Sequence, residues 1–299
     1  MNDAAGTHSP ESLDELVTEA GGAAGTNYEL RSTVELVELM STTEEAVPRA
    51  VREARGAIAE AIDGIVERLA GGGRLVYVGA GTSGGLAALD AGECEATFST
   101  APGQVVAVTA EGSAAEDDHE AGAVEIREVE VSDADAVVGI SASGRTPYVL
   151  GALEAANDAG AFTVALVCSE GSELAGLADH EIAVVVGPEF IAGSTRLKAG
   201  TAQKLVLNAI STISMIRLGK TFGNLMVDVA AENEKLRARV HRIVRTATGA
   251  PPGEVDEALD AAGGDAKVAI VSLLAAVDAP TARERLREAG GNVRTALGR

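Results

Sequence analysis

Aromatic residues are scarce in this sequence of 299 residues, where they make up 2% of the chain and include no tryptophan. A hydrophobic core must therefore be built from alanine, valine, leucine and isoleucine, within an apolar content of 46%. Few rings are available on which nucleobases could stack, and this speaks against a binder of single-stranded nucleic acid.

Positive charge is also in short supply. The sequence has 24 lysines and arginines, of which 19 are arginines, and 45 aspartates and glutamates. The formal net charge is therefore −21 at pH 7. A surface with this charge repels the phosphodiester backbone of nucleic acids and anionic lipid headgroups. We therefore expect neither nucleic acid nor a membrane as a partner.

Cysteine and histidine are too few and too scattered for a metal site. Cys94 and Cys168 follow no zinc or redox spacing, and His119-Glu120 lacks the second histidine of a zinc protease motif. The sequence has no apolar run of about 18 residues and no signal peptide. We expect a reduced, cytoplasmic protein without a bound metal.

The length indicates one large α/β unit with an appendage. A short helix is expected over residues 12–20 of an N-terminal arm. A helix start at Ser41-Thr42-Thr43 precedes apolar residues at helical spacing as far as Leu69, and Pro251-Pro252 marks a later change of composition. The expected parts are the arm (1–40), a main domain (41–249) and a C-terminal module of three short helices (250–299).

Five short β-branched runs alternate with helical stretches in the main domain. Continuous apolar strands of this kind indicate a doubly wound parallel sheet covered by helices on both faces, which binds ligands at the carboxyl ends of its strands. After the last strand, helices are expected over residues 194–218 and 226–246. The expected strands are 74–78, 104–108, 136–140, 162–167 and 181–186.

Two of the loops that follow strands are rich in glycine and hydroxyl groups. The first, GAGTSG at residues 79–84, fits the dinucleotide pattern formally, but an acidic residue about twenty positions on is missing, because Glu111 comes too late. The second, SASGRTP at residues 141–147, leads into a helix with Thr146 at its N-cap. Backbone N–H groups and small hydroxyls suit a phosphomonoester better than a dinucleotide. The alternative is that the loop serines only cap helices.

Two acidic clusters fall at the same edge of the expected sheet, Glu93-Cys94-Glu95 and residues 116–120 (EDDHE). Carboxylates in these places suit general acid and base catalysis, provided that one is desolvated enough to hold a proton near neutral pH. Acidic residues are also favourable in the first turn of any helix, so the second cluster has a purely structural alternative.

Five motifs in order resemble the N-acetylmuramic acid 6-phosphate etherase family of the sugar isomerase (SIS) superfamily, which is related to the glucokinase regulatory protein. The resemblance runs from about Ser32 to the C-terminus. It implies a SIS-type sheet sandwiched by helices, a C-terminal module similar to UBA domains, and a homodimer with shared active sites. The motifs are GAGTSG (79–84), LDAGEC (89–94), GISASGRTPY (139–148), GSTRLKAGTAQKLVLN (193–208) and GKTFGNLMVD (219–228).

The resemblance also implies a reaction and its residues. Family members cleave the C3 lactyl ether of N-acetylmuramate 6-phosphate by elimination and water addition, with no cofactor. Glu93 matches the acid for the departing lactate and Glu116 the second carboxylate, which we assign as the base at C2. Glu189 and Lys198 are weaker candidates, for ring opening and for phosphate charge. The residues expected to hold the 6-phosphate are Thr82, Ser83, Ser141, Ser143, Gly144 and Thr146.

The chain departs from the family pattern at Gly85, where arginine is usual, and at Glu95-Ala96, where two prolines are usual. Two alternatives therefore stay open beside the etherase. One is a related SIS lyase or isomerase acting on another sugar 6-phosphate, and the other is a regulator that binds a sugar phosphate without catalysis.

Overall fold

The computed structural model describes residues 27–112, 114–228 and 234–298. The short helix expected over residues 12–20 lies outside these ranges. The described helices and strands, in chain order, are η2 (Tyr28–Leu30), α1 (Thr33–Glu44), α2 (Ala46–Glu53), α3 (Arg55–Ala70), β1 (Leu75–Gly79), α4 (Gly81–Phe98), β2 (Val105–Thr109), η3 (Ala115–Asp117), α5 (His119–Glu128), β3 (Ala136–Ser141), α6 (Pro147–Asp158), β4 (Phe162–Val167), α7 (Glu173–Leu177), β5 (His180–Ala183), α8 (Lys198–Arg217), β6 (Thr221–Phe222), β7 (Leu225–Met226), α9 (Glu234–Thr248), α10 (Pro252–Ala262), α11 (Ala266–Ala275), α12 (Ala279–Glu288) and α13 (Val293–Ala296).

A five-stranded sheet with the order β2-β1-β3-β4-β5 forms the centre of the fold. The β1–β3, β3–β4 and β4–β5 pairs are parallel, as expected for continuous apolar strands. All residues of β1 and β3 are buried because both faces of the sheet are covered. The expected α/β fold is therefore confirmed, and each predicted strand has a counterpart, although β5 ends at Ala183 rather than at residue 186.

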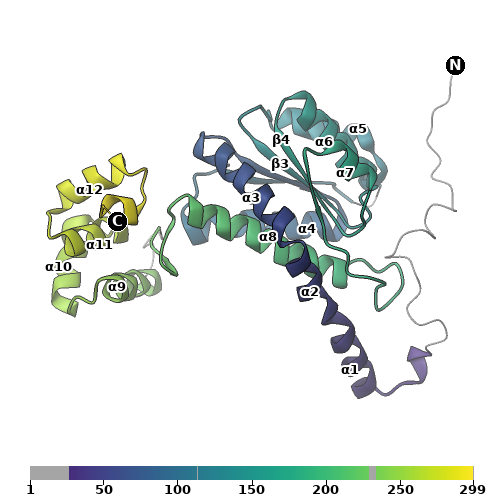
Figure 1. Cartoon of the computed structure of the whole chain (residues 1–299), viewed down its shortest axis with the longest axis horizontal. Coiled ribbons are helices and arrows are strands. Elements are labelled where there is room, and N and C mark those ends of the chain that lie inside the picture. Colours follow the sequence, from purple (N-terminus) through teal and green to yellow (C-terminus); the bar gives the residue numbers. More distant parts are fainter. Residues whose placement is uncertain (1–26, 113, 229–233, 299) are drawn as a thin grey trace. The chain divides into compact units, whose positions relative to one another are not determined.

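Helices cover the two faces in different ways (Figure 1). The helix α3 contacts β1, β3, β4 and β5, and its buried stripe of Ile58, Ile62, Ile65 and Leu69 has helical spacing. On the other face α5, α6 and α7 share one apolar core with the strands. The backbones of α5 and α6 approach so closely at Gly122 that a Cβ there would collide with a carbonyl oxygen of α6.

The start of the long N-terminal helix was predicted wrongly. The sequence favoured a helix beginning at Ser41–Thr43, but these residues lie inside α1, where the Thr43 hydroxyl donates to the Leu39 carbonyl at 2.8 Å instead of capping. The helix begins at Thr33, after the N-cap residue Ser32, whose side chain forms a capping box with Glu35. A new helix, α2, begins just before Pro48, because proline has no N–H to donate to the preceding turn.

Two further boundaries differ from the predictions. The helix α8 begins at Lys198 rather than Ser194, because Glu189 accepts hydrogen bonds from the backbone N–H groups of Lys198 and Ala199 and so fixes the first turn there. Met226 belongs to the β6–β7 hairpin, and α9 begins at Glu234. The chain before α8 is therefore a loop.

The chain forms two compact units. One comprises residues up to Asp90 together with Val106–Ile210, and the other comprises Ala91–Val105 and Ser211–Arg299. The apolar core of the second unit contains Val240 and Val244 of α9 beside Val255 and Ile270 of α10 and α11. Among the described residues, no helix combines the length and the apolar character that a membrane crossing requires.

A buried ion pair fixes the amino ends of β1 and β3. Asp135 is 3% exposed and accepts hydrogen bonds from the Arg74 backbone N–H and from its guanidinium, each at 2.8 Å. The Ser132 N–H donates to the same carboxylate at 3.0 Å. Burial alone would raise the pKa of Asp135, but the hydrogen bonds from Arg74 and Ser132 outweigh it and hold the pKa below its usual range.

We predict that Asp135→Asn lowers the free energy of unfolding by about 3 kcal/mol at pH 7, because it leaves a partly buried guanidinium without its charge partner. The native pKa is depressed, so the ionised carboxylate stabilises the fold above about pH 5, and this contribution is lost as the pH falls through the native value. Urea unfolding of both proteins should show the difference shrinking below about pH 4. Asp133→Asn, at an exposed neighbour, should change stability by less than about 0.5 kcal/mol. A difference that is constant down to pH 3 would contradict the prediction.

Candidate active site

The carboxyl ends of β1 and β3 meet at the point where the strand order reverses. In open parallel sheets this switch point is where ligands bind. A cavity of about 520 Å³ lies there, within the first compact unit. Its lining comes from residues 80–83 after β1, Glu116 of η3, residues 140–141 at the end of β3, residues 142–143 and Thr146 after it, and residues 193–196 before α8.

The loop after β1 depends on three glycines. A Cβ at Gly79 would lie 2.8 Å from the Gly84 nitrogen, and one at Gly84 would lie 2.7 Å from the Gly79 oxygen, so the turn into α4 closes only without side chains. Gly81 has φ +53°, and a Cβ there would lie 2.8 Å from Oε1 of Glu116. The loop therefore leaves room for the Glu116 carboxyl beside its own backbone.

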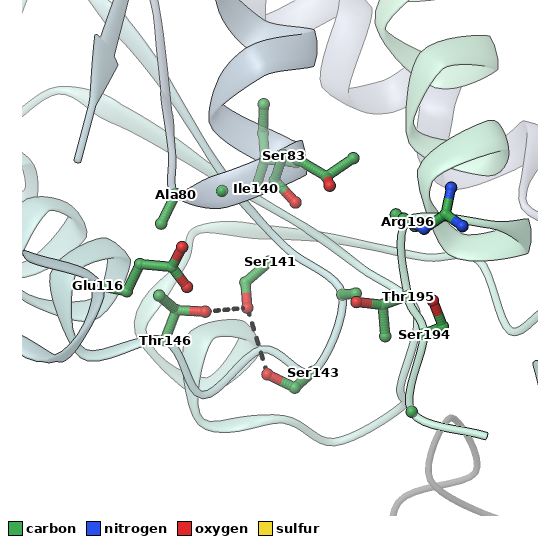
Figure 2. A pocket seen from close by; sticks show the side chains of 14 residues that line it. Ala80, Ser83, Glu116, Ile140, Ser141, Ser143, Thr146, Ser194, Thr195 and Arg196 are labelled. Carbon is green, nitrogen blue, oxygen red and sulfur yellow. Dashed lines mark hydrogen bonds between the residues drawn. The ribbon is translucent and has the colours of Figure 1, made fainter. Parts of the chain in front are cut away.

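The loop after β3 is organised by Ser141, which is 3% exposed. Its Oγ accepts a hydrogen bond from the Gly144 N–H at 3.0 Å and lies 2.8 Å from the Thr146 hydroxyl and 3.5 Å from the Ser143 hydroxyl. Figure 2 shows these three hydroxyl groups gathered on one side of the cavity. Thr146 is the N-cap of α6 and Pro147 its first residue, as predicted, but the Thr146 side chain bonds to Ser141 rather than capping the helix.

Gly144 supports this loop from outside the cavity lining. It is buried, its φ is +67°, and a Cβ there would collide with the Ser172 side chain. Its carbonyl accepts the Leu174 N–H at 2.9 Å. Gly144 thus shapes the turn that carries Ser143 and Thr146.

The acidic cluster at residues 116–120 divides between two roles. Asp118 caps α5 by accepting the Ala121 N–H at 3.0 Å, and Glu120 pairs with Arg127 at 3.0 Å, so the structural alternative holds for these two residues. Glu116, half-buried on η3, lines the cavity. Of the residues in this cluster, Glu116 is the carboxylate placed to meet a ligand.

The loop that precedes α8 was missed by the sequence analysis. Because a helix was predicted from Ser194, Arg196 was taken as a helical residue, yet it lies in the loop and lines the cavity. Figure 2 shows Arg196 and Glu116 on opposite sides of the cavity, with the serine hydroxyls between them. The GSTR sequence that begins at Gly193 was the available signal, since glycine at φ +72° ends regular structure.

Glu189 and Lys198 are not part of the cavity lining. Glu189 is 1% exposed and accepts the N–H groups at the start of α8, while the Lys198 Nζ donates to the Val186 carbonyl at 2.7 Å. Burial, and then the charge of Glu189, raise the pKa of the nearby Cys168 thiol to about 12. These contacts hold the first turn of α8, and the suggested roles in ring opening and phosphate charge stay predictions.

Glu93 is exposed on α4, in the stretch that belongs to the second compact unit, and it is not part of the cavity lining. The structure therefore brings Glu116 together with five of the six predicted phosphate residues, but it does not bring Glu93 to them within the described cavity. Among the described residues, no group of three histidine, cysteine or acidic side chains is arranged to hold a metal ion. Five residues of the predicted phosphate set line the cavity: Thr82, Ser83, Ser141, Ser143 and Thr146.

Comparisons with known proteins identify the fold. The sequence matches the family model of the glucokinase regulatory protein N-terminal SIS domain over residues 57–157 and that of the SIS domain over residues 119–213. A candidate phosphosugar isomerase from Bacteroides fragilis has a solved structure that aligns with a TM-score of 0.50 at 20% identity, covering 62% of this chain and 91% of its own. These findings confirm the SIS fold.

Relatives with higher identity cover nearly the whole chain. The N-acetylmuramic acid 6-phosphate etherase of Rubrobacter xylanophilus is 57% identical over 296 residues, which is 96% of this chain and 98% of the relative. Proteins of the same name from Streptomyces coelicolor and Mycolicibacterium smegmatis are 52% and 47% identical, over 95% and 96% of this chain and 94% and 99% of their own lengths.

We predict that Gly144→Ala lowers the free energy of unfolding by about 2–4 kcal/mol, because a left-handed φ and a collision with Ser172 both oppose a Cβ. Urea unfolding measures the loss. Gly176→Ala is the matched control, since nothing lies within 4 Å of a Cβ at this exposed position of α7, and it should be neutral or slightly stabilising. Equal stability of the two variants would contradict the role given to Gly144.

Proposed function

The chain belongs to the N-acetylmuramic acid 6-phosphate etherase family, and we propose that it cleaves the C3 lactyl ether of N-acetylmuramate 6-phosphate to N-acetylglucosamine 6-phosphate and D-lactate. One observation carries this proposal. The half-buried carboxyl of Glu116 shares a cavity with a cluster of hydroxyl groups suited to a phosphate. A phosphate anchor beside a carboxylate is what proton removal from a sugar phosphate requires.

The phosphate is held mainly by neutral donors. Hydroxyl groups of Thr82, Ser83, Ser143 and Thr146 and backbone N–H groups at the start of α4 and α6 surround it, as at other helix N-termini that bind anions. Arg196 adds a positive charge on the side opposite Glu116. The 520 Å³ cavity has room for a monosaccharide phosphate.

The carboxylates then divide the chemistry. In the open-chain sugar the C2 proton is acidic because it lies next to the C1 aldehyde, and Glu116 removes it. As the electron pair forms the C2–C3 double bond, the C3–O bond breaks and the lactyl oxygen takes a proton from Glu93. Water then adds, with its hydroxyl at C3 and a proton at C2, so one water is consumed for each lactate released.

The assembly that we propose is a homodimer with shared active sites. Its support is α8, which exposes Leu205, Ile213 and Ile216, and residues eight and three positions apart lie along one stripe of a helix. In our proposal, the shared site brings Glu93 to a cavity whose described lining does not include it. The sugar phosphate is then the small-molecule partner, and the net charge of −21 argues against nucleic acid.

We place the enzyme in the cytoplasm. Neither Cys94 nor Cys168 forms a disulfide, and both are buried, as is usual for cysteines in a reducing compartment. The sugar phosphate that the reaction consumes is charged, and such molecules are retained inside cells.

The decisive test is lactate release from N-acetylmuramate 6-phosphate, followed in deuterated water with two isosteric variants. Glu116→Gln should lose both deuterium incorporation at C2 and product, by about 10²–10⁴-fold, because the base is gone. Glu93→Gln should still exchange the C2 proton but release little lactate, since an unassisted alkoxide leaves poorly. Mass spectrometry and a lactate assay give the two readings.

The reverse pattern would exchange the two roles, and full activity of both variants would remove these residues from the mechanism. Both variants should keep the wild-type affinity for N-acetylglucosamine 6-phosphate within about threefold, since neither carboxyl holds the phosphate. A wild-type protein that binds this sugar phosphate but releases no lactate would favour one of the two alternative functions.

We predict that Ile213→Glu halves the molar mass measured by light scattering at micromolar concentration, because a charge would be buried in the dimer contact. Val124→Glu is the matched control, since Val124 on α5 is exposed to a similar degree, 39% against 41% for Ile213. It should stay dimeric. An active wild-type monomer would contradict the homodimer.

A further inference from the structure

The cavity hydroxyl of Ser83 has a buried partner behind the lining. Its Oγ lies 2.9 Å from Oε1 of Gln203, a residue of α8 that is 1% exposed. The other end of the same amide, Nε2, is buried and has no hydrogen-bond partner among the described residues. Among the described residues, the Ser83 hydroxyl is therefore the hydrogen-bond partner of the Gln203 amide, and it lies at the edge of the cavity.

A count of protons shows why this pair is sensitive to a ligand. A serine hydroxyl has one proton, and as long as it donates to Oε1 of Gln203 it presents only lone pairs to the cavity. A phosphate dianion also offers only lone pairs, so the two oxygens would repel. The buried Nε2 meanwhile leaves two N–H donors unsatisfied, which is costlier than an unsatisfied carbonyl.

Turning the amide by 180° removes the repulsion and replaces the unsatisfied buried Nε2 with an unsatisfied carbonyl oxygen, which costs less. The nitrogen and the oxygen of a glutamine amide occupy nearly the same shape, so the turn needs no extra space. Nε2 then donates to Ser83 Oγ, and the Ser83 proton is released toward the cavity. The carbonyl oxygen then occupies the buried position that Nε2 held, where no donor lies within reach.

The part of α8 that carries Gln203 has contacts that do not involve Ser83. The first turn of α8 is fixed by Glu189 through the N–H groups of Lys198 and Ala199. One residue after Gln203, Lys204 pairs with the buried Asp90 of α4 at 3.7 Å. A substitution of Gln203 should thus leave α4 and α8 together.

We propose that Gln203 is a positioning residue that donates its side-chain amide to Ser83 Oγ and so directs the Ser83 hydroxyl proton at a phosphate in the cavity. This inference rests on the phosphate site assigned under the proposed function. In this proposal Gln203 does not touch the ligand. It sets the direction in which the Ser83 hydroxyl donates its proton.

The test measures binding of N-acetylglucosamine 6-phosphate by titration calorimetry at pH 8. Gln203→Glu, whose carboxylate can only accept, should weaken binding at least 30-fold, because it holds the Ser83 proton and adds a negative charge. Gln203→Met should weaken binding by only about threefold, since the Ser83 hydroxyl is then free to turn. Lys204→Gln, the matched control on the adjacent residue, should bind like the wild type.

Two further readings separate positioning from packing. In a Ser83→Ala background the loss caused by Gln203→Glu should shrink by about tenfold, because the proton that it withholds is already absent. As the pH falls, the ratio of variant to wild-type dissociation constant should fall, since the carboxyl that Gln203→Glu introduces can donate again once it is protonated. Charged groups lie in the Lys204–Asp90 pair on the adjacent residue and in the cavity lining, at Glu116 and Arg196.

Equal losses for Gln203→Glu and Gln203→Met that do not change with pH or with Ser83→Ala would overturn the proposal in favour of simple packing. An equal loss for Lys204→Gln would assign the effect to loosening of α4 against α8. The absence of any binding of the sugar phosphate or of inorganic phosphate by the wild type would also overturn it. Lactate release is measured separately, so a binding pattern as expected without lactate would reject the etherase and keep the role of Gln203.

Discussion

The parallel pairing of β1 with β3 is the constraint on which the site depends. These strands are neighbours in the sheet, although the chain between them passes through α4, β2 and α5, and their register pairs Gly79 with Ile140. The loops that follow both strands are therefore forced side by side at one edge. The Arg74–Asp135 pair fixes the opposite ends of the same two strands, so the register that aligns the loops is set at a distance from them. The proposed phosphate cradle is a consequence of strand order more than of any one contact.

Close backbone approach is the second requirement, and it is met by glycine at the places where elements touch. Gly122 lets α5 lie against α6, and since η3 directly precedes α5, this contact helps to set where Glu116 enters the cavity. Gly81 then leaves the space that the Glu116 carboxyl occupies. Glycine loses more conformational entropy on folding than other residues, so each of these glycines lowers the stability of the fold. The same glycines allow the backbone to approach closely enough to form the site.

The sequence predicted the sheet and its loops well because both signals are local. A buried parallel strand is a continuous apolar run, and a turn at Gly79–Gly84 or Ser141–Pro147 has its own residue pattern. What could not be predicted depends on long-range contacts. The start of α8 is set by Glu189, and Ser141 pairs with Thr146 only once the loop has folded. The sequence pattern therefore places Arg196 in a helix and does not single out Gln203. The acidic run at 116–120 could not be divided by pattern alone, because a carboxylate that caps a helix and one that lines a cavity look alike in sequence.

A strongly acidic protein that handles an anionic sugar must solve an electrostatic problem. Its net charge of −21 opposes the approach of a phosphate dianion, and a lysine in the cradle would be the simplest remedy. Lys198 is instead buried and donates to the Val186 carbonyl, so it serves the start of α8. In the proposed phosphate site, the cavity offers hydroxyl protons, helix N-termini and the single guanidinium of Arg196 among its lining residues. Neutral donors bind an anion only when their protons point at it, because each hydroxyl is as ready to accept as to donate. In the proposed site the orientation of a proton replaces the charge that a lysine would supply. Buried side chains behind the lining that fix this orientation are then as much a part of the proposed binding site as the lining itself.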